Sequence, residues 1–193
     1  TKDQSIYYFK AVPQSFLHEP GVTKFLYLQS PTYAPEVVDT TENGWILMKN
    51  VTGVKLTNIK KIETWERTLS EYAELQTQMV THRTELVLLN CPVRSVKQVI
   101  CRLDDFAHSL EPSPFGEEFK HSLPRLKDVG LELLALNLPT TLEHGDFWNG
   151  NVIVNEGSEI LFFDWSDCSI SHPFFSMVKF LEDESFLPKE ENI

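Results

Sequence analysis

The chain has 193 residues and a mass of 22.2 kDa, which suffices for one ordinary domain or two small lobes with a buried core. Hydrophobic residues make up 41% of the chain, a share typical of globular domains and too high for an intrinsically disordered protein. The formal net charge of -11 provides no general basic surface, and this argues against a nucleic-acid partner.

The cysteine content and the apolar runs indicate the compartment. The three cysteines share no short spacing, which argues against a disulfide framework or a zinc cluster and favours a reducing cytoplasm. No apolar run approaches the ~20 residues that cross a bilayer, and residues 1–4 do not resemble the start of a signal peptide. We therefore expect a soluble, cytoplasmic protein without a membrane partner.

The first fifty residues alternate between β and helical patterns. Residues 5–12 are rich in aromatic and β-branched residues and end at a proline, which predicts a strand. A proline opens and a Ser-Pro pair closes a short helical pattern over residues 20–30. The Asn43-Gly44 pair lies between two apolar segments, residues 37–38 and 45–48, and predicts a hairpin.

Apolar spacings of three and four predict a helical middle. A long amphipathic helix is expected from Thr57 or Asn58 to about residue 81, followed by helices over 96–110 and 123–136. The change of pattern near residue 51 places the lobe boundary there, with an N-terminal lobe at 1–51 and a helical C-terminal lobe at 52–193.

The pattern changes again near the C-terminal end. Residues 152–154 and 160–163 predict two short strands, which the turn-forming residues 155–157 would join as a hairpin. A last helix is expected to begin at Pro173.

The densest polar cluster, His-Gly-Asp-Phe-Trp-Asn-Gly-Asn at 144–151, directly precedes the first strand of this hairpin, and Asp164 ends the second. Pairing of the strands would bring Asn151 and Asp164 to the same end of the ladder. An amide and a carboxylate, completed by water and phosphate oxygens, are ligands that Mg²⁺ accepts. Asp146 would stay free to take a proton from an attacking hydroxyl. The sequence thus predicts a metal site beside a general base.

The string His-Gly-Asp, four residues and Asn, followed by an apolar strand and Phe-Phe-Asp-Trp, resembles the signature of the aminoglycoside phosphotransferase and choline kinase-like family. These are small-molecule relatives of the protein kinases. The resemblance implies an α+β, protein kinase-like bilobal fold, with a small N-lobe that is incomplete here and a larger helical C-lobe that carries a catalytic β-hairpin. It also implies that Asp146 is the catalytic aspartate and that Asn151 and Asp164 hold Mg²⁺.

The resemblance extends to the N-terminal residues. Lys10 corresponds to the lysine that pairs with nucleotide phosphates, and Glu19 to the glutamate that orients it. Met48, Asn50 and Val51 fall in the segment that links the lobes and binds adenine in the family. The implied activity is transfer of the γ-phosphoryl group of ATP or GTP, with Mg²⁺, to a small-molecule hydroxyl. Antibiotics, sugars, amino alcohols and amino acids are candidate acceptors.

The chain departs from the family pattern in two places. The family has two strands and a phosphate-covering loop before its lysine strand, so we expect roughly 25 to 60 further residues before Thr1 and more chain after Ile193. Many relatives also carry an aspartate three residues after the proline that follows the metal-binding aspartate. Here Ser176 lies three residues after Pro173.

Two other functions use the same residues. An inactive kinase-like scaffold would keep the nucleotide site, and a metal-dependent phosphohydrolase would use the same oxygen ligands. Retention of Asp146, Asn151 and Asp164 together argues against the scaffold. His144 is expected to brace the loop rather than to act as a base, and the tryptophans Trp65, Trp148 and Trp165 are expected to pack.

Overall fold

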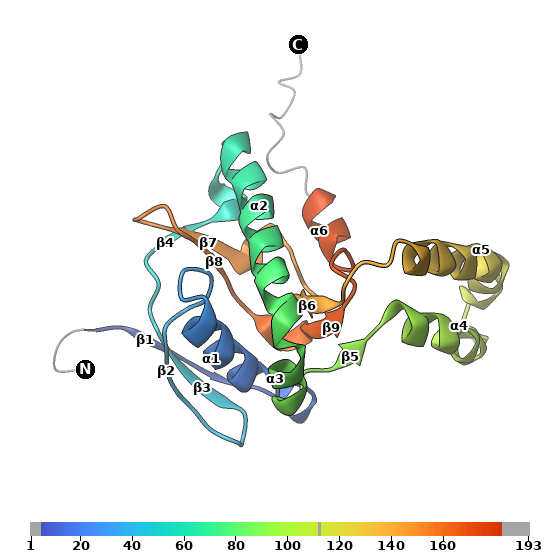
Figure 1. Ribbon diagram of the computed structural model, residues 1–193, viewed down its shortest axis with the longest axis horizontal. Coiled ribbons are helices and arrows are strands. Elements are labelled where there is room, and N and C mark those ends of the chain that lie inside the picture. Colours follow the sequence, from blue (N-terminus) through green and yellow to red (C-terminus); the bar gives the residue numbers. More distant parts are fainter. Residues whose placement is uncertain (1–4, 112, 183–193) are drawn as a thin grey trace, which may run out of the picture.

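The computed structural model describes residues 5–111 and 113–182 and combines several helices with three small sheets (Figure 1). Each sheet has three strands, in the orders β1-β3-β2, β4-β7-β8 and β5-β9-β6. Within the described residues, none of the helices is both long enough and apolar enough to cross a membrane.

The N-terminal sheet holds β3 between two antiparallel neighbours. Its strands are β1 (Tyr7–Ala11), β2 (Val37–Thr40) and β3 (Trp45–Lys49). Gly44 has a φ of +82°, and a Cβ there would lie 2.8 Å from side-chain atoms of Val12 and Leu17. The predicted hairpin turn therefore requires a glycine at this position. The helix α1 (Glu19–Gln29) contacts β2 and buries Val22 and Leu26.

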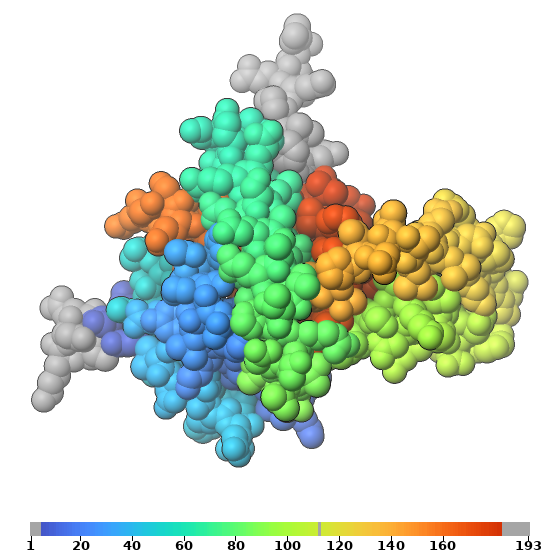
Figure 2. Space-filling view, in the orientation of Figure 1, coloured from blue at the N-terminus to red at the C-terminus, as the bar shows by residue number. Residues whose placement is uncertain are grey.

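The other two sheets lie close to the long helix α2. One contains β4 (Gly53–Lys55), β7 (Val152–Asn155) and β8 (Ile160–Phe162), and the other β5 (Val93–Arg94), β6 (Thr141–Glu143) and β9 (Ser169–Ser171). The remaining helices are α2 (Ile62–Met79), α3 (Arg83–Leu88), α4 (Val96–Leu110), α5 (Gly116–Ala135) and α6 (Met177–Leu181). The helices α4 and α5 pack on each other and project to one side of the molecule (Figures 1 and 2).

The sequence predicts the existence of these helices better than their ends. The helix α2 begins at Ile62 rather than at Thr57 or Asn58, because Leu56–Asn58 form a 3-10 turn and Ile59 is extended. The helix α5 begins at Gly116 rather than Leu123 and contains Pro124 in its interior. The helix α6 begins at Met177 rather than Pro173, because residues 173–176 form a turn.

Four strands are absent from the sequence-based prediction. They are β4, β5, β6 and β9, each of two or three residues, and such short segments show no alternation of polar and apolar side chains. They are specified by their partners: β4 pairs with β7, and β9 pairs with both β5 and β6. The middle of the chain is therefore not entirely helical.

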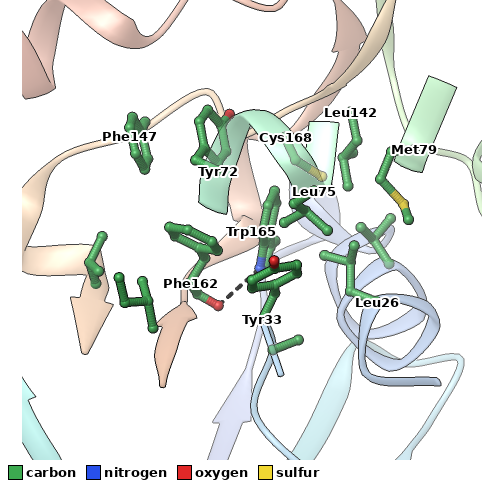
Figure 3. Packing of buried hydrophobic residues seen from close by; sticks show 14 of the residues in the cluster. Leu26, Tyr33, Tyr72, Leu75, Met79, Leu142, Phe147, Phe162, Trp165 and Cys168 are labelled. Carbon is green, nitrogen blue, oxygen red and sulfur yellow. Dashed lines mark hydrogen bonds between the residues drawn. The ribbon is translucent and has the colours of Figure 1, made fainter. Parts of the chain in front are cut away.

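An aromatic core lies between α2, the β7-β8 hairpin and α6 (Figure 3). The ring of Phe147 is fully buried between Tyr72 and Phe180, with centroid distances of 4.0 and 4.8 Å. Phe162 packs beside both Tyr72 and Phe147. Burial of such a ring contributes on the order of 2 to 3 kcal/mol. The polar cluster is thus anchored to the core by its own phenylalanine.

Candidate functional site

The β7-β8 hairpin confirms the predicted strand pairing. Val152 lies opposite Phe162, and the amide N–H of Phe163 donates to the carbonyl of Asn151 at 2.9 Å. Asn151 and Asp164 consequently lie at the same end of the ladder. The reversal at the other end is one residue longer than predicted and includes Ser158, whose φ is +65°.

The loop of residues 143–151, which we call the catalytic loop after the role expected from the sequence, is held in place on its buried side. Gly145 has a φ of +79°, and a Cβ at this position would collide with the backbone carbonyl of Asp167. Only glycine fits there. The imidazole Nε2 of His144 lies 2.8 Å from the carbonyl oxygen of Phe163. Burial lowers the pKa of His144 to about 4, against the opposing effect of that carbonyl. His144 is therefore neutral and ties the loop to the strand end.

Asp146 lies on the open side of the same loop, with a side chain that is 27% exposed. The Nδ2 of Asn151 donates to the backbone carbonyl of Asp146 at 3.0 Å and to its Oδ2 at 3.1 Å. The ammonium of Lys179 donates to Oδ1 of the same carboxylate. These contacts fix the orientation of Asp146 from two sides.

A hollow of about 480 Å³ lies beside this carboxylate, lined by Asp146, Trp148, Lys179 and Glu182. The indole of Trp148 is 41% exposed and lies over Gly150, where a Cβ would collide with the ring. Trp65 and Trp165, by contrast, are buried in the core. The exposed face of the loop is thus a surface on which a small molecule could rest against Asp146.

Lys10, Glu19 and Asp164 form a second charged group, the donor cluster. The Nζ of Lys10 lies 2.6 Å from Oε1 of Glu19 and 2.8 Å from Oδ1 of Asp164. Glu19 is only 4% exposed, and burial raises its pKa while Lys10 opposes the rise. Burial also lowers the pKa of Lys10, but the hydrogen bonds to Asp164 and Glu19 outweigh this and raise it. Lys10 is therefore a charged group held by two carboxylates.

Asp164 adopts the left-handed conformation, with φ 59° and ψ 67°. Aspartate tolerates this backbone geometry better than most residues. Its Oδ1 accepts hydrogen bonds from Lys10 and from the hydroxyl of Ser166, at 2.8 and 2.7 Å. Burial would raise the pKa of Asp164, but these two donors hold it below its usual value. The carboxylate is thus kept ionised, and its other oxygen remains available as a ligand.

The donor cluster opens into a cavity of about 490 Å³ between the N-terminal sheet and the hairpin. Met48 and Val51 line this cavity, as do Lys10, Glu19 and Asp164. The residues Tyr8, Phe9 and Ile153 supply apolar walls. A cavity of this size with apolar walls and charges at one end suits a nucleotide-sized molecule.

Asn50 is not among the residues that line this cavity. It lines a neighbouring hollow of about 300 Å³, which Val51 also borders, and its backbone N–H donates to the carbonyl of Ile6 at 3.0 Å. Of the three residues expected to bind adenine, Met48 and Val51 therefore border the cavity that contains Lys10, and Asn50 borders the neighbouring hollow.

The oxygen atoms at the end of the hairpin fit a hard divalent cation. The amide nitrogen of Asn151 is committed to Asp146, which leaves its oxygen for a ligand, and Asp164 has one oxygen not used by Lys10 or Ser166. Across the described parts of the chain, no three His, Cys, Asp or Glu side chains group in a way that could hold a metal. These two oxygen atoms therefore suit a Mg²⁺ ion that takes its other ligands from phosphate and water.

The sequence profile of the phosphotransferase enzyme family matches residues 10–190. The chain belongs to this family. The match includes the catalytic loop and the whole donor cluster, so the resemblance based on the His-Gly-Asp motif is confirmed. No curated protein sequence matches this phosphotransferase-family chain.

Solved structures of kinases and phosphotransferases share the fold of this family member. Choline kinase LicA from Streptococcus pneumoniae superposes with a TM-score of 0.64 and 13% identity, over 96% of this chain and 64% of the other. Plasmodium vivax ethanolamine kinase superposes with a TM-score of 0.60 and 18% identity, over 99% of this chain and 60% of the other. A spectinomycin phosphotransferase in complex with ADP and spectinomycin superposes with a TM-score of 0.51 and 12% identity, over 96% of this chain and 64% of the other.

These superpositions identify an α+β, protein kinase-like fold, as the sequence predicts. The phosphotransferase-family chain spans about three fifths of the length of the choline and ethanolamine kinase structures.

Three contributors to the site are not predicted from the sequence. Lys179 reaches Asp146 only because α6 packs beside the loop, Ser166 contacts Asp164, and Glu143 lies buried under the loop. Ser166 is two residues from Asp164, and that proximity is the one local signal among the three.

Proposed function

We propose that this chain forms the catalytic part of a small-molecule kinase that transfers the γ-phosphoryl group of ATP or GTP to a hydroxyl group. The observation that carries this proposal is the arrangement around the hairpin end. A partly exposed carboxylate, Asp146, lies on the loop that leads to Asn151, which shares the hairpin end with Asp164 and Lys10. A base, two metal ligands and a phosphate-binding cation thus occupy one site.

In this proposal the cavity containing Lys10 receives the nucleotide. Met48, Asn50 and Val51 belong to the segment that binds the adenine, with Met48 and Val51 as cavity-lining residues. Lys10 binds phosphate oxygens, and Glu19 orients it through their 2.6 Å contact. Residues 1–51 would form the N-terminal lobe, and residues 52–193 the C-terminal lobe with the catalytic loop.

The proposed reaction is an in-line displacement at the γ-phosphorus. The acceptor oxygen forms a bond to phosphorus, the bond to the bridging oxygen of the diphosphate breaks, and that oxygen leaves with the electron pair. Asp146 takes the hydroxyl proton. Bound Mg²⁺, held by Asn151 and Asp164, supplies charge neutralisation for the phosphate oxygens.

The acceptor enters from the hollow beside Trp148 and Lys179. The structural relatives include enzymes named for choline, ethanolamine and spectinomycin, which all carry a hydroxyl group and a cationic nitrogen. We therefore propose a hydroxyl-bearing small molecule as the acceptor, and amino alcohols and amino-group antibiotics are the first to test.

The deciding experiment measures ADP or GDP release from Mg-ATP and Mg-GTP with and without choline, ethanolamine, spectinomycin, a hexose and serine. Release that depends on one acceptor, with a product heavier by one phosphoryl group, supports the proposal. Phosphate release without any acceptor would indicate a phosphohydrolase. Nucleotide binding without turnover would indicate a scaffold.

A further inference from the structure

Glu143 is a buried carboxylate that the proposed reaction does not use. It ends β6, three residues before Asp146, and is 1% exposed. The strand β6 runs beside α2 in the interior of the molecule (Figure 1). A carboxylate in such a position is strongly destabilising unless its oxygens are hydrogen-bonded.

Both oxygens of Glu143 are in fact occupied by donors from three separate segments. Its Oε2 accepts the backbone N–H of Gly145 at 2.8 Å. Its Oε1 accepts the backbone N–H of Ser176 at 3.1 Å, the Ser176 hydroxyl, and the Tyr72 hydroxyl at 3.4 Å. The Tyr72 oxygen accepts the N–H of His144 at 3.0 Å. Two consecutive amides of the catalytic loop are thus held by Glu143, one directly and one through Tyr72.

The same carboxylate connects the catalytic loop to α6. Ser176 directly precedes that helix, and Lys179, on its first turn, contacts Asp146. Glu143 therefore holds the backbone of the loop and also the start of the helix that carries Lys179, the partner of Asp146. Burial raises the pKa of Glu143, and the hydrogen bonds from Ser176, Gly145 and Tyr72 oppose that rise.

We propose that Glu143 is a positioning residue for Asp146. Its carboxylate holds the amides of the catalytic loop and the start of α6 in fixed positions relative to each other. This inference rests on the proposed function. It also gives a role to Ser176, at the position where the family resemblance predicts an aspartate: the acidic group comes from the end of β6, and Ser176 donates hydrogen bonds to it. The side chain of Ser176 touches Oε1 of Glu143, so a carboxylate at either position reaches the same space.

The test is a swap of the carboxylate between the two positions in the full-length protein. Glu143→Ala should lower kcat about 10- to 100-fold, the effect of a catalytic group displaced by about an ångström, while the Kd for Mg-ATP changes less than about threefold. Ser176→Asp alone should also lower kcat, because two carboxylates then face each other. The double variant should recover most of the lost kcat, measured with the acceptor that the wild-type protein phosphorylates.

Hydrogen exchange gives a readout that needs no acceptor. The peptide covering residues 142–150 should exchange at least about tenfold faster in Glu143→Ala and return toward the wild-type rate in the double variant, while α4 and α5 stay unchanged. If the wild-type protein phosphorylates no acceptor, the proposed function fails, but this exchange pattern still decides whether Glu143 holds the loop.

Glu143→Gln keeps the size of the side chain and guards against a variant that fails to fold. The NH₂ group of the glutamine would face the N–H donor of either Gly145 or Ser176, so one hydrogen bond would be lost and kcat should fall about tenfold. Glu132→Gln, at an exposed position of α5, is the matched control. The proposal is overturned if the double variant is no more active than Glu143→Ala, if Mg-ATP affinity falls in parallel with kcat, or if exchange rises equally throughout the chain.

Discussion

The donor cluster joins Lys10 to Glu19 and to Asp164, residues up to 154 positions apart, whereas the catalytic loop gathers Glu143, His144 and Asp146 within a few consecutive residues. The loop is fixed by a glycine that admits no side chain, by a buried histidine and by a buried phenylalanine. The donor cluster is instead formed when β1, α1 and the end of β8 come together. Substitutions in the loop should therefore change turnover, and substitutions in the donor cluster should change nucleotide affinity.

The largest effect is expected for Asp146→Asn. The amide cannot take the acceptor proton, so kcat should fall by about 10² to 10⁴, while calorimetry should give a Kd for Mg-ATP within about threefold of the wild-type value. Asp128→Asn, on the exposed face of α5, is the control and should leave both constants unchanged. Unchanged turnover in Asp146→Asn would remove this residue from the mechanism.

The second prediction concerns the pH dependence of the loop. The pKa of His144 is about 4 in the folded protein, below the 6.5 of an ordinary histidine, so the unfolded state binds more protons between these values. His144 thus contributes stability that is complete above pH 6.5 and is lost as the pH falls toward 4. The loss should reach about 3 kcal/mol of unfolding free energy.

Urea unfolding at pH 7.0 and 4.5 tests this prediction. His144→Gln should lose clearly less stability than the wild-type protein over this interval, because the titrating group is gone. His121→Gln, at an exposed position, should keep the wild-type slope. Equal slopes for all three proteins would show that His144 does not titrate in the buried state described here.

The third prediction compares substitutions at the two ends of the hairpin by their effect on Mg-ATP affinity. Asp164→Ala removes the proposed Mg²⁺ ligand and the partner of Lys10, and should weaken Mg-ATP binding about 100-fold. Asn155→Ala, at the opposite end, breaks only the local contacts with Glu159 and should have little effect on that affinity. Equal losses in Mg-ATP titrations would mean that the metal site does not lie at the Asn151 end.

The smallest effect is expected for Glu19→Gln. The amide still fits beside Lys10 but lacks the charge, so the Kd for Mg-ATP should rise about 3- to 10-fold, with kcat nearly unchanged. Glu111→Gln provides the comparison, because Glu111 pairs with Lys120 at the surface, where such contacts contribute little. A fall in kcat without loss of affinity would place Glu19 with the catalytic loop instead of the donor cluster.

The sequence predicted the parts of the molecule whose signals are local. Two short apolar runs, joined by the turn-forming residues 155–157, predicted the hairpin and with it the common position of Asn151 and Asp164. Spacings of three and four predicted α2 through Trp65 and Tyr72, both of which are buried. Such patterns arise because a short segment presents one face to the core, and they need no knowledge of the rest of the fold.

Other features depend on tertiary contacts and could not be predicted in this way. The strand β9 has three residues and exists because β5 and β6 pair with it. Lys179 lies on a helix of five residues whose position is set by packing of Phe180 against Phe147. Glu143 looks like an ordinary polar residue at a strand end until its donors are known. The meeting of Lys10 and Glu19 was predicted from the family resemblance alone.

The cysteines give the protein an internal reporter of local opening. Cys91 and Cys168 are buried with their sulfur atoms 3.9 Å apart, whereas Cys101 is exposed. A thiol reagent should therefore modify Cys101 at once and reach the other two only when the segment behind Asp164 and the start of β5 separate from the core. Because a bound nucleotide stabilises the closed form by mass action, the slow labelling rate should fall as nucleotide is added. Nucleotide binding can thus be followed on the protein without any substitution, by mass spectrometry of the labelled thiols, and no acceptor needs to be known.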